Sequence, residues 1–391
     1  LATGAMLESR DGHVAMLATR NLELTNDITT DRFYERFYQV RRRLFSKKVT
    51  EYIKTSVDET VQPGLVSGRT VSLGAGGDLS LVGSVVLGDG AVGLHADGDM
   101  NLLSAAEHDY VDSLRTVKKS GIFGNGGLSI TIGSQSRTTF TSTDSTKQHA
   151  ASVGSLAGDI AATAGGQYLQ LSSDLAAPMG DISISAANVA IQSRDDTTSI
   201  LNLVRQRQSG LTISLSHPLL DTLQTVNQMA SVAKRTDNGR FQAMALLTAG
   251  LSVYNNWGKL NPLTGIDSLG GLTPGNLADA GWSLNLSLGS SSSSFESISK
   301  SSTPVSSAID AGRNVRIASW GGGEDRGDIS LVAARLSAGG DMQLTAARDI
   351  TMAAAIGNTS EATRSRSSAG AVGVSLGAAG ASVSLMASRS N

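Results

Sequence analysis

The chain has 391 residues, enough for a sizeable core, with 44 glycines, 4% aromatic residues and a net charge of −2. Small apolar side chains suit the narrow interior of a repetitive β-solenoid better than the broad, aromatic-rich core of an ordinary enzyme domain. The nearly neutral charge gives no overall field that selects nucleic acid or an anionic membrane. The lack of cysteine excludes disulfides, thiolate catalysis and zinc–thiolate sites. The sequence has no run of about 18 apolar residues, so no membrane-spanning helix is predicted.

The first part of the chain predicts a partial coil followed by an arm. Residues 1–30 hold short strands, and residues 31–67 are rich in Phe, Tyr, Arg and Lys. Two interpretations of this arm are open. One is a basic–aromatic patch for nucleic acid or a membrane surface; the other is an arm that packs its rings on the side of the solenoid and solvates its charges. Interleaved acidic residues, such as Asp31 and Glu35, favour the second.

The chain is organised around residues 68–106, where apolar runs of three or four residues are cut by Gly and Asp. Leu79–Val82 and Met100–Leu103 are two such runs, too short for helices and alternating like half-buried strands. Glycine tolerates positive φ and aspartate can bond its own backbone, so Gly-Asp pairs are typical of tight turns. The stretch therefore predicts the first β-helix repeat, and residues 107–155 follow as a Ser/Thr-rich arm.

The same unit returns twice. Residues 156–193 are the second repeat: Gly158 follows Gly68, and Gly180 follows Gly90, by 90 positions in each case. Residues 310–355 are the third. The sequence thus predicts coils that alternate with serine-rich, strand-forming arms.

The remaining segments are arms as well. Residues 194–309 are an arm in which 219–257 carries apolar residues at helical spacing and predicts an αα-hairpin. Residues 356–391 form the terminal arm. The alternating strands at 128–140, 282–295 and 371–385 are compatible with pairing to one another or to the sheet edge of another protein.

No catalytic, cofactor-binding or metal-binding residue is predicted. The histidines are scattered, with no spacing that gives two ligands on one face; they are His13, His95, His108, His149 and His217. His108, near Asp109 and Asp112, is the best candidate ligand, but an exposed arm explains it better. Turn formation explains Asp97 and Asp99 better than calcium binding does. Asp195 and Asp196 are neighbours on an expected strand, so their side chains point to opposite faces and do not converge as an acid/base pair.

Two features together resemble a known family. Lys118–Phe123 leads into the strand Leu128–Ser136, and Gly-Asp coils recur at roughly 20-residue intervals; Arg43–Lys48 resembles a variant of the same arm. This arrangement resembles the haemagglutinin-repeat region of filamentous haemagglutinin-like exoproteins, the long bacterial surface proteins that include contact-dependent growth inhibition effectors.

The resemblance implies a right-handed parallel β-helix that is secreted to the bacterial cell surface through an outer-membrane two-partner secretion transporter. Such proteins act as adhesins or as stalks that present a C-terminal toxin to neighbouring cells. The implied partners are that transporter and a receptor or the envelope of a target cell. Independently of the resemblance, the arms are compatible with peripheral membrane contact, and no nucleic-acid partner is expected.

Two family features are missing, the amino-terminal secretion domain and the Val-Glu-Asn-Asn junction before a toxin. The chain is therefore expected to be a non-enzymatic fragment of a longer polypeptide, without a cofactor and without toxin activity of its own. The alternative is a β-helical enzyme that acts on polysaccharides, which would need a converging acid/base set.

Overall fold

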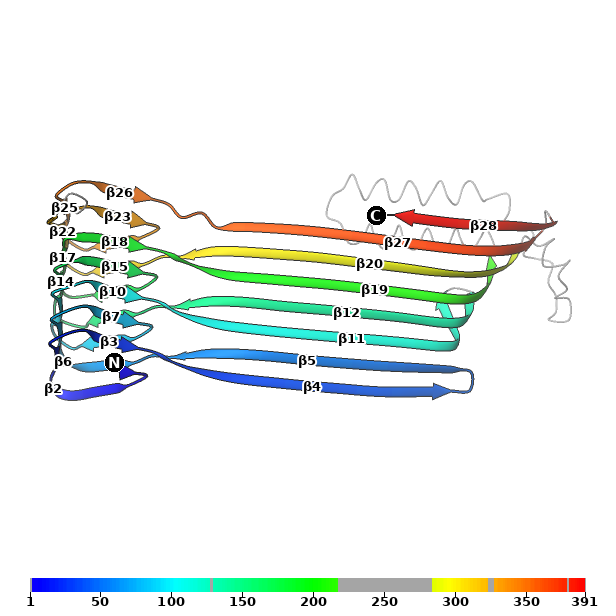
Figure 1. The fold of residues 1–391 in the computed structure, drawn as a ribbon, viewed down its shortest axis with the longest axis horizontal. Helices are drawn as coiled ribbons and strands as arrows, with labels where there is room; N and C mark the ends of the chain where they lie inside the picture. The colour runs from blue at the N-terminus through cyan, green and yellow to red at the C-terminus, as the bar shows by residue number, and fades with distance from the viewer. Residues whose placement is uncertain (1, 127–128, 217–282, 323–326, 378–379, 391) are drawn as a thin grey trace.

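The computed structural model describes residues 2–126, 129–216, 283–322, 327–377 and 380–390, and these are built from strands and turns. A stack of parallel coils forms a solenoid, and long antiparallel hairpins project from one side of it (Figure 1). This architecture confirms the predicted all-β parallel β-helix with β-strand arms. The predicted αα-hairpin at 219–257 lies outside the described residues.

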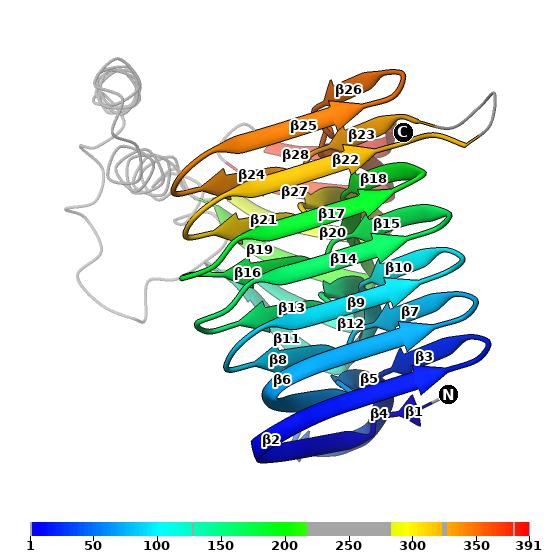
Figure 2. The ribbon, with the colours of Figure 1, turned by 90° about the vertical axis from the view of Figure 1, so that its left-hand side faces the viewer.

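Two parallel sheets make the walls of the solenoid (Figure 2). One wall is an 8-stranded sheet of short strands: β1 (Ala2–Thr3), β3 (Leu22–Thr25), β7 (Leu79–Val82), β10 (Met100–Leu103), β15 (Gln167–Leu171), β18 (Asn188–Gln192), β23 (Ile329–Val332) and β26 (Ile350–Ala353). The other walls belong to one 12-stranded sheet that bends around a corner: β2 (Met6–Ala18), β6 (Leu65–Ala75), β8 (Val85–Gly88), β9 (Val92–Ala96), β13 (Ser152–Ser155), β14 (Ile160–Ala164), β16 (Asp174–Ala177), β17 (Ile182–Ala186), β21 (Ala308–Ala311), β22 (Val315–Ser319), β24 (Arg335–Ala338) and β25 (Met342–Ala346). The bend lies within β6, whose first half pairs with β8 and whose second half pairs with β9.

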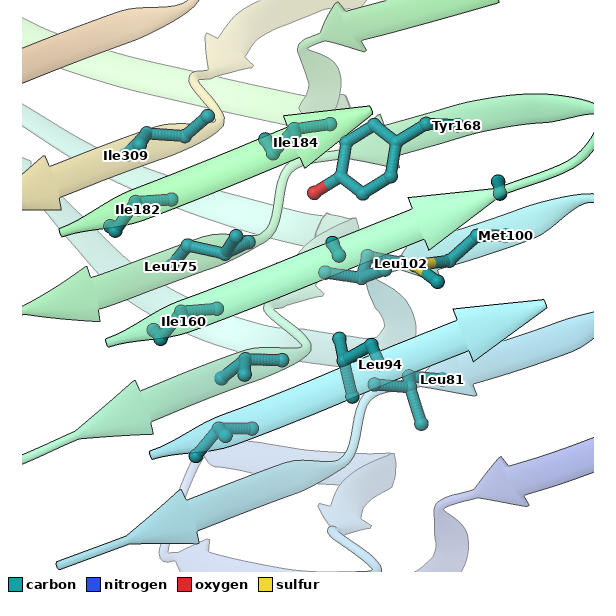
Figure 3. Close-up of a cluster of buried hydrophobic side chains, with 14 of the residues drawn as sticks. Leu81, Leu94, Met100, Leu102, Ile160, Tyr168, Leu175, Ile182, Ile184 and Ile309 are labelled. Carbon is teal, nitrogen blue, oxygen red and sulfur yellow. The ribbon is translucent and has the colours of Figure 1, made fainter. Parts of the chain in front are cut away.

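The core is the narrow interior between these walls (Figure 3). Buried and outward-facing residues alternate along the short strands, as in β14 and β17, because successive side chains of a strand point to opposite faces. Val, Ile, Leu and Ala fill the interior, as the composition predicts. Met100 and Tyr168 are also fully buried members of the core, and the hydroxyl of Tyr168 donates to Oε1 of the buried Gln170 at 3.0 Å. Gln170 in turn donates to the carbonyl of Ala308 at 3.2 Å, so this polar pair links coils inside the core.

The hairpins form the third sheet, called the hairpin sheet below. Its eight strands are antiparallel and lie in the order β28-β27-β20-β19-β12-β11-β5-β4. Their bounds are β4 (Asp27–Arg43), β5 (Ser46–Gln62), β11 (Ala105–Gly126), β12 (Ser129–His149), β19 (Arg194–Ser216), β20 (Ser283–Val305), β27 (Asn358–Gly377) and β28 (Gly380–Ser390). The strands at 128–140, 282–295 and 371–385, for which two pairings were open, pair within this one sheet.

The hairpins form one continuous sheet because the advance of two coils along the stack equals the width of one two-stranded hairpin. They leave the solenoid after β3, β10, β18 and β26, that is, after every second coil. Neighbouring strands lie about 4.8 Å apart, so two coils advance along the stack as far as the two strands of one hairpin are wide. Each hairpin therefore lies beside the next in hydrogen-bonding register, as between β5 and β11 and between β12 and β19.

In the other coils the same corner is closed by a two-residue turn. Gly83, Ser172 and Ala333 take equivalent places there with φ of 50°, 43° and 49°, the left-handed region that a tight reversal requires. Buried serine side chains satisfy the backbone at this corner. Ser84 donates to the carbonyl of Val82 at 2.8 Å, and Ser173 to that of Leu171 at 2.8 Å.

The Gly-Asp turns join successive coils, which differs from the expectation that each aspartate bonds its own backbone. Oδ1 of Asp78 accepts the N–H of Asp99 in the next coil at 2.9 Å. At a second corner, Oδ1 of Asp181 accepts the N–H of Asn314 at 2.9 Å and its Nδ2–H at 3.0 Å. Asn314 then accepts the N–H of Asp341 at 2.7 Å. These side chains form ladders along the stack, so they hold coils together as well as turning the chain.

Candidate functional site: the faces of the hairpin sheet

The aromatic arm is the edge of the hairpin sheet. Phe33, Tyr34, Phe37 and Tyr38 lie on β4, whose outer side has no partner strand among the described residues. Their side chains are between 47% and 64% exposed. The interpretation that these rings pack on the side of the solenoid is therefore wrong. The arm extends away from the stack because it pairs with β5 along its full length, and Lys54 on β5 lies 5.8 Å from the ring centroid of Phe33.

The distal end of the hairpin sheet carries exposed aliphatic side chains on one face. Ile122, Ile132, Leu288, Val372 and Leu385 stand in one row across the strands, because their register pairs them through Leu211. Adjacent rows add further members on the same face. The group, called the aliphatic tip, consists of Ile122, Ile130, Ile132, Leu284, Leu288, Val372, Val374, Leu376, Val383 and Leu385, each between 37% and 83% exposed.

The opposite face at the same height is mainly polar. Its corresponding row begins with Phe123 on β11 and continues through Thr131, Thr212, Ser287, Gly373 and Ser384. The hydroxyls of Thr131 and Thr212 lie 2.9 Å apart, which ties β12 to β19. At the distal end of the hairpin sheet, large aliphatic side chains therefore gather on one face, and the other face carries mainly polar or small residues.

A row of glycines separates the aliphatic tip from the rest of the sheet. Gly121, Gly133, Gly210 and Gly289 pair in succession across four strands. Gly121 and Gly210 have φ of 100° and 150°, and a Cβ at Gly133 would lie 2.1 Å from the carbonyl oxygen of Ser209. Larger residues cannot take this place without a shift of the neighbouring strand, because glycine alone permits this approach of backbones.

His108 was the best candidate ligand, although an exposed arm was the favoured interpretation, and the side chains near it have separate partners. His108 Nδ1 lies 3.0 Å from Oγ1 of Thr146 and 3.8 Å from Oδ1 of Asp144. Asp109 pairs with Lys147 at 3.3 Å on the other face, and Asp112 accepts the hydroxyl of Tyr110 at 2.5 Å. Across the described residues, no three His, Asp or Glu side chains come close enough to hold a metal ion.

Two acidic sites have structural partners. Asp195 accepts a hydrogen bond from Ser302 on β20, whereas Asp196 accepts the N–H of Gln148 on β12 at 2.7 Å, so the two carboxylates bond to different neighbouring strands. Hydrogen bonding to Asp112 raises the pKa of Tyr110, because the phenolate would lose this bond and meet a carboxylate.

In the part of the chain that the structure describes, no helix has the length and apolarity to cross a membrane.

Sequence reasoning missed the aliphatic tip as a surface. The alternation of Leu128, Ile130 and Ile132 indicated one apolar face of a strand, but not that several strands add their faces together. The missing signal is register: Ile132, Leu288 and Leu385 are far apart in the sequence and meet only in the hairpin sheet.

A parallel β-helix that carries a fused sheet of lateral hairpins defines a solenoid scaffold of repeating units. The chain belongs to the Hemagglutinin repeat family, whose model matches residues 46–203 and 288–391. This membership confirms the resemblance to filamentous haemagglutinin-like exoproteins.

Relatives with assigned activities are much longer than this chain. It is 30% identical to the tRNA nuclease CdiA of Yersinia mollaretii over 372 residues, 94% of this chain and 12% of that protein. It is 32% identical to the tRNA nuclease CdiA of Escherichia coli strain STEC_O31, over 93% of this chain and 11% of that protein. The Deoxyribonuclease CdiA of Yersinia pseudotuberculosis is 30% identical over 78% of this chain and 28% of that protein. No solved structure gives a significant match.

Proposed function

We propose that this chain is a non-catalytic structural and adhesive segment of a large secreted bacterial surface protein, a β-helical stalk that mediates cell contact or presents a C-terminal toxin. The family and the CdiA relatives support this, since the chain spans only about a tenth of most of them. The parent protein leaves the cell through an outer-membrane two-partner secretion transporter and works outside the bacterium. The nuclease activities that name the relatives are not assigned to this segment.

The aliphatic tip is the observation that carries the contact function. Ten large aliphatic side chains exposed together on one face form a patch of the kind that marks interaction surfaces. The solenoid supports this patch at the far end of long hairpins, away from the stack (Figure 1). The proposed partner is the lipid of a target-cell envelope, because aliphatic side chains without aligned polar groups suit hydrocarbon.

Binding to lipid vesicles tests this function. Phosphatidylcholine vesicles are used because their zero net charge removes simple charge attraction. The chain is expected to sediment with them, and the double variant Leu288→Ser/Leu385→Ser to bind at least about tenfold more weakly, since burying one leucine is worth about 2 kcal/mol.

The matched control is Leu17→Ser/Leu156→Ser, which removes two leucines that are 81% and 59% exposed on the solenoid. It is expected to bind like the unaltered chain. Failure of the unaltered chain to bind, or equal loss in both double variants, would refute lipid contact through the aliphatic tip.

A further inference from the structure

A shallow trough crosses the hairpin sheet on the same face as the aliphatic tip, on the solenoid side of it. It extends over β5, β11, β12, β19, β20 and β27, with a volume of about 850 Å³, and a second hollow of about 510 Å³ adjoins it toward β28. Six exposed cations line the two hollows: Lys47, Lys118, Arg205, Arg207, Arg366 and Arg389. We call this surface the basic trough.

The register of the strands places these cations on one face. Lys118, Arg207 and Arg389 belong to a single row across the sheet, joined through Ser136, Ser292 and Ser368. Arg205 and Arg366 belong to the next row, on either side of Ser294. The cations converge although they come from five separate strands.

The floor of the basic trough is made of serines. The hydroxyls of Ser134 and Ser209 lie 3.0 Å apart, and those of Ser292 and Ser368 lie 2.9 Å apart. Short side chains keep the floor low, and each hydroxyl retains hydrogen-bonding capacity for a ligand, because it is both donor and acceptor.

The cations of the basic trough form no ion pairs with the described residues of the protein. Its lining contains no Asp or Glu, and within the described ranges none of the six cations takes part in an ion pair. The nearby Glu51 is 2.8 Å from Arg36, which lies outside the lining. Unpaired arginines beside hydroxyl groups are a site for carboxylate or phosphate groups.

The spacing of the cations indicates a linear ligand. Strands lie about 4.8 Å apart, so Lys118 and Arg207 are about 10 Å apart along the trough, and so are Arg205 and Arg366. From Lys118 to Arg389 the trough crosses five strand intervals, about 24 Å. A chain with one anionic group in each 10 Å would meet a cation at every repeat.

The chemistry of the lining identifies the class of this chain. Among the residues that the structure describes, no aromatic side chain lines the trough, whereas proteins that bind single-stranded nucleic acid stack its bases on aromatic rings. Sugars instead need many hydrogen-bonding groups, which the serines provide. We propose that the basic trough binds a linear acidic polysaccharide with one carboxylate per disaccharide, whose repeat length matches the cation spacing.

Hyaluronan oligosaccharides, which have this charge spacing, serve as the probe, and binding to the full chain is measured by calorimetry. The chain is expected to bind them in a salt-dependent manner. The variant Arg207→Gln/Arg366→Gln is expected to bind at least about tenfold more weakly, because hydrogen bonds to charged groups are worth about 1.5–3 kcal/mol each.

The control variant Arg69→Gln/Arg335→Gln makes the same change of charge on the solenoid and is expected to retain affinity. Unchanged thermal unfolding, followed by circular dichroism, shows that each variant is folded. Equal loss in both variants, equal binding of uncharged dextran, or tighter binding of oligothymidylate would overturn the proposal. Tighter binding of polygalacturonate, with a carboxylate on every sugar, would refute the disaccharide spacing.

Discussion

Removing the hairpin of β11 and β12 tests whether the match between coil pitch and strand spacing holds the hairpin sheet together. The perturbation replaces Ser104–Ala151 with the Gly-Ser pair that closes the equivalent corner at Gly83 and Ser84. The coils on either side remain, so the anchor points of β5 and β19 stay three strand intervals apart, about 14 Å. This gap is too wide for a hydrogen-bonded ladder, and the solenoid prevents it from closing.

The hairpin of β4 and β5 should then become a separate two-stranded ribbon, which is marginally stable in water. It loses the ladder that joins Ser46–Asp58 to β11. Each hydrogen bond contributes about 1 kcal/mol net, so losing even three of them raises the exchange rate of these amides by at least about 100-fold. Hydrogen exchange read by mass spectrometry measures this rate, and peptides from β14 and β17 are expected to stay protected.

Deleting residues 358–390, the hairpin of β27 and β28, is the matched control because it leaves β5, β11 and β12 in place. Protection of β4 and β5 should be unchanged in that variant. Continued protection of β5 in the first variant would refute this reasoning. It would mean either that the sheet had closed the gap or that the two-stranded hairpin is stable alone.

Three further outcomes follow from single residues. Ile184→Ala, at a side chain that is 1% exposed, should lower the free energy of unfolding by about 2–5 kcal/mol in urea titrations. Hydrogen bonds from Asn314 hold the pKa of Asp181 below its usual range, so the stability that Asp181 contributes is present at neutral pH and is lost as the pH falls through that lowered pKa. Asp181→Asn should therefore flatten this part of the curve of stability against pH. An unchanged curve would contradict the assignment of this effect to Asp181. Gly158→Ala should lower the midpoint of thermal unfolding, because the added Cβ would lie 2.4 Å from the backbone nitrogen of Ala91. Gly93→Ala is the control and should not lower it, because a Cβ at Gly93 would have no atom within 4 Å. Equal midpoints in the two variants would refute the steric argument.

The strands of the solenoid were predictable because each carries its own signal. Leu79–Val82 and Met100–Leu103 are strands with the predicted bounds, since the alternation of apolar residues and the Gly-Asp cuts act locally. The 90-residue offset between Gly90 and Gly180 also has a structural meaning: a Cβ on Gly180 would lie 1.9 Å from the carbonyl oxygen of Gly158, which itself packs on Gly90. Equivalent turns therefore stack coil on coil.

The surfaces were not predictable because they depend on register between distant segments. Lys118 and Arg207 belong to one trough only because β12 lies between their strands and aligns them. The packing of the aromatic arm was predicted wrongly for the same reason. The sequence of Phe33 and Tyr34 shows large apolar rings but not the strand β5, which holds them away from the solenoid.

Because a hairpin follows every second coil, the solenoid and the hairpin sheet repeat together in units of two coils and one hairpin. Whole units can be added or removed, and both the stack and the hairpin sheet close again without a defect. One extra coil would be harmless in a plain solenoid, but here it would offset every later hairpin by one strand spacing and leave a slot as wide as one strand. The length of such a solenoid is therefore expected to change in steps of two coils and one hairpin, and an insertion or deletion that keeps the fold would add or remove that whole unit.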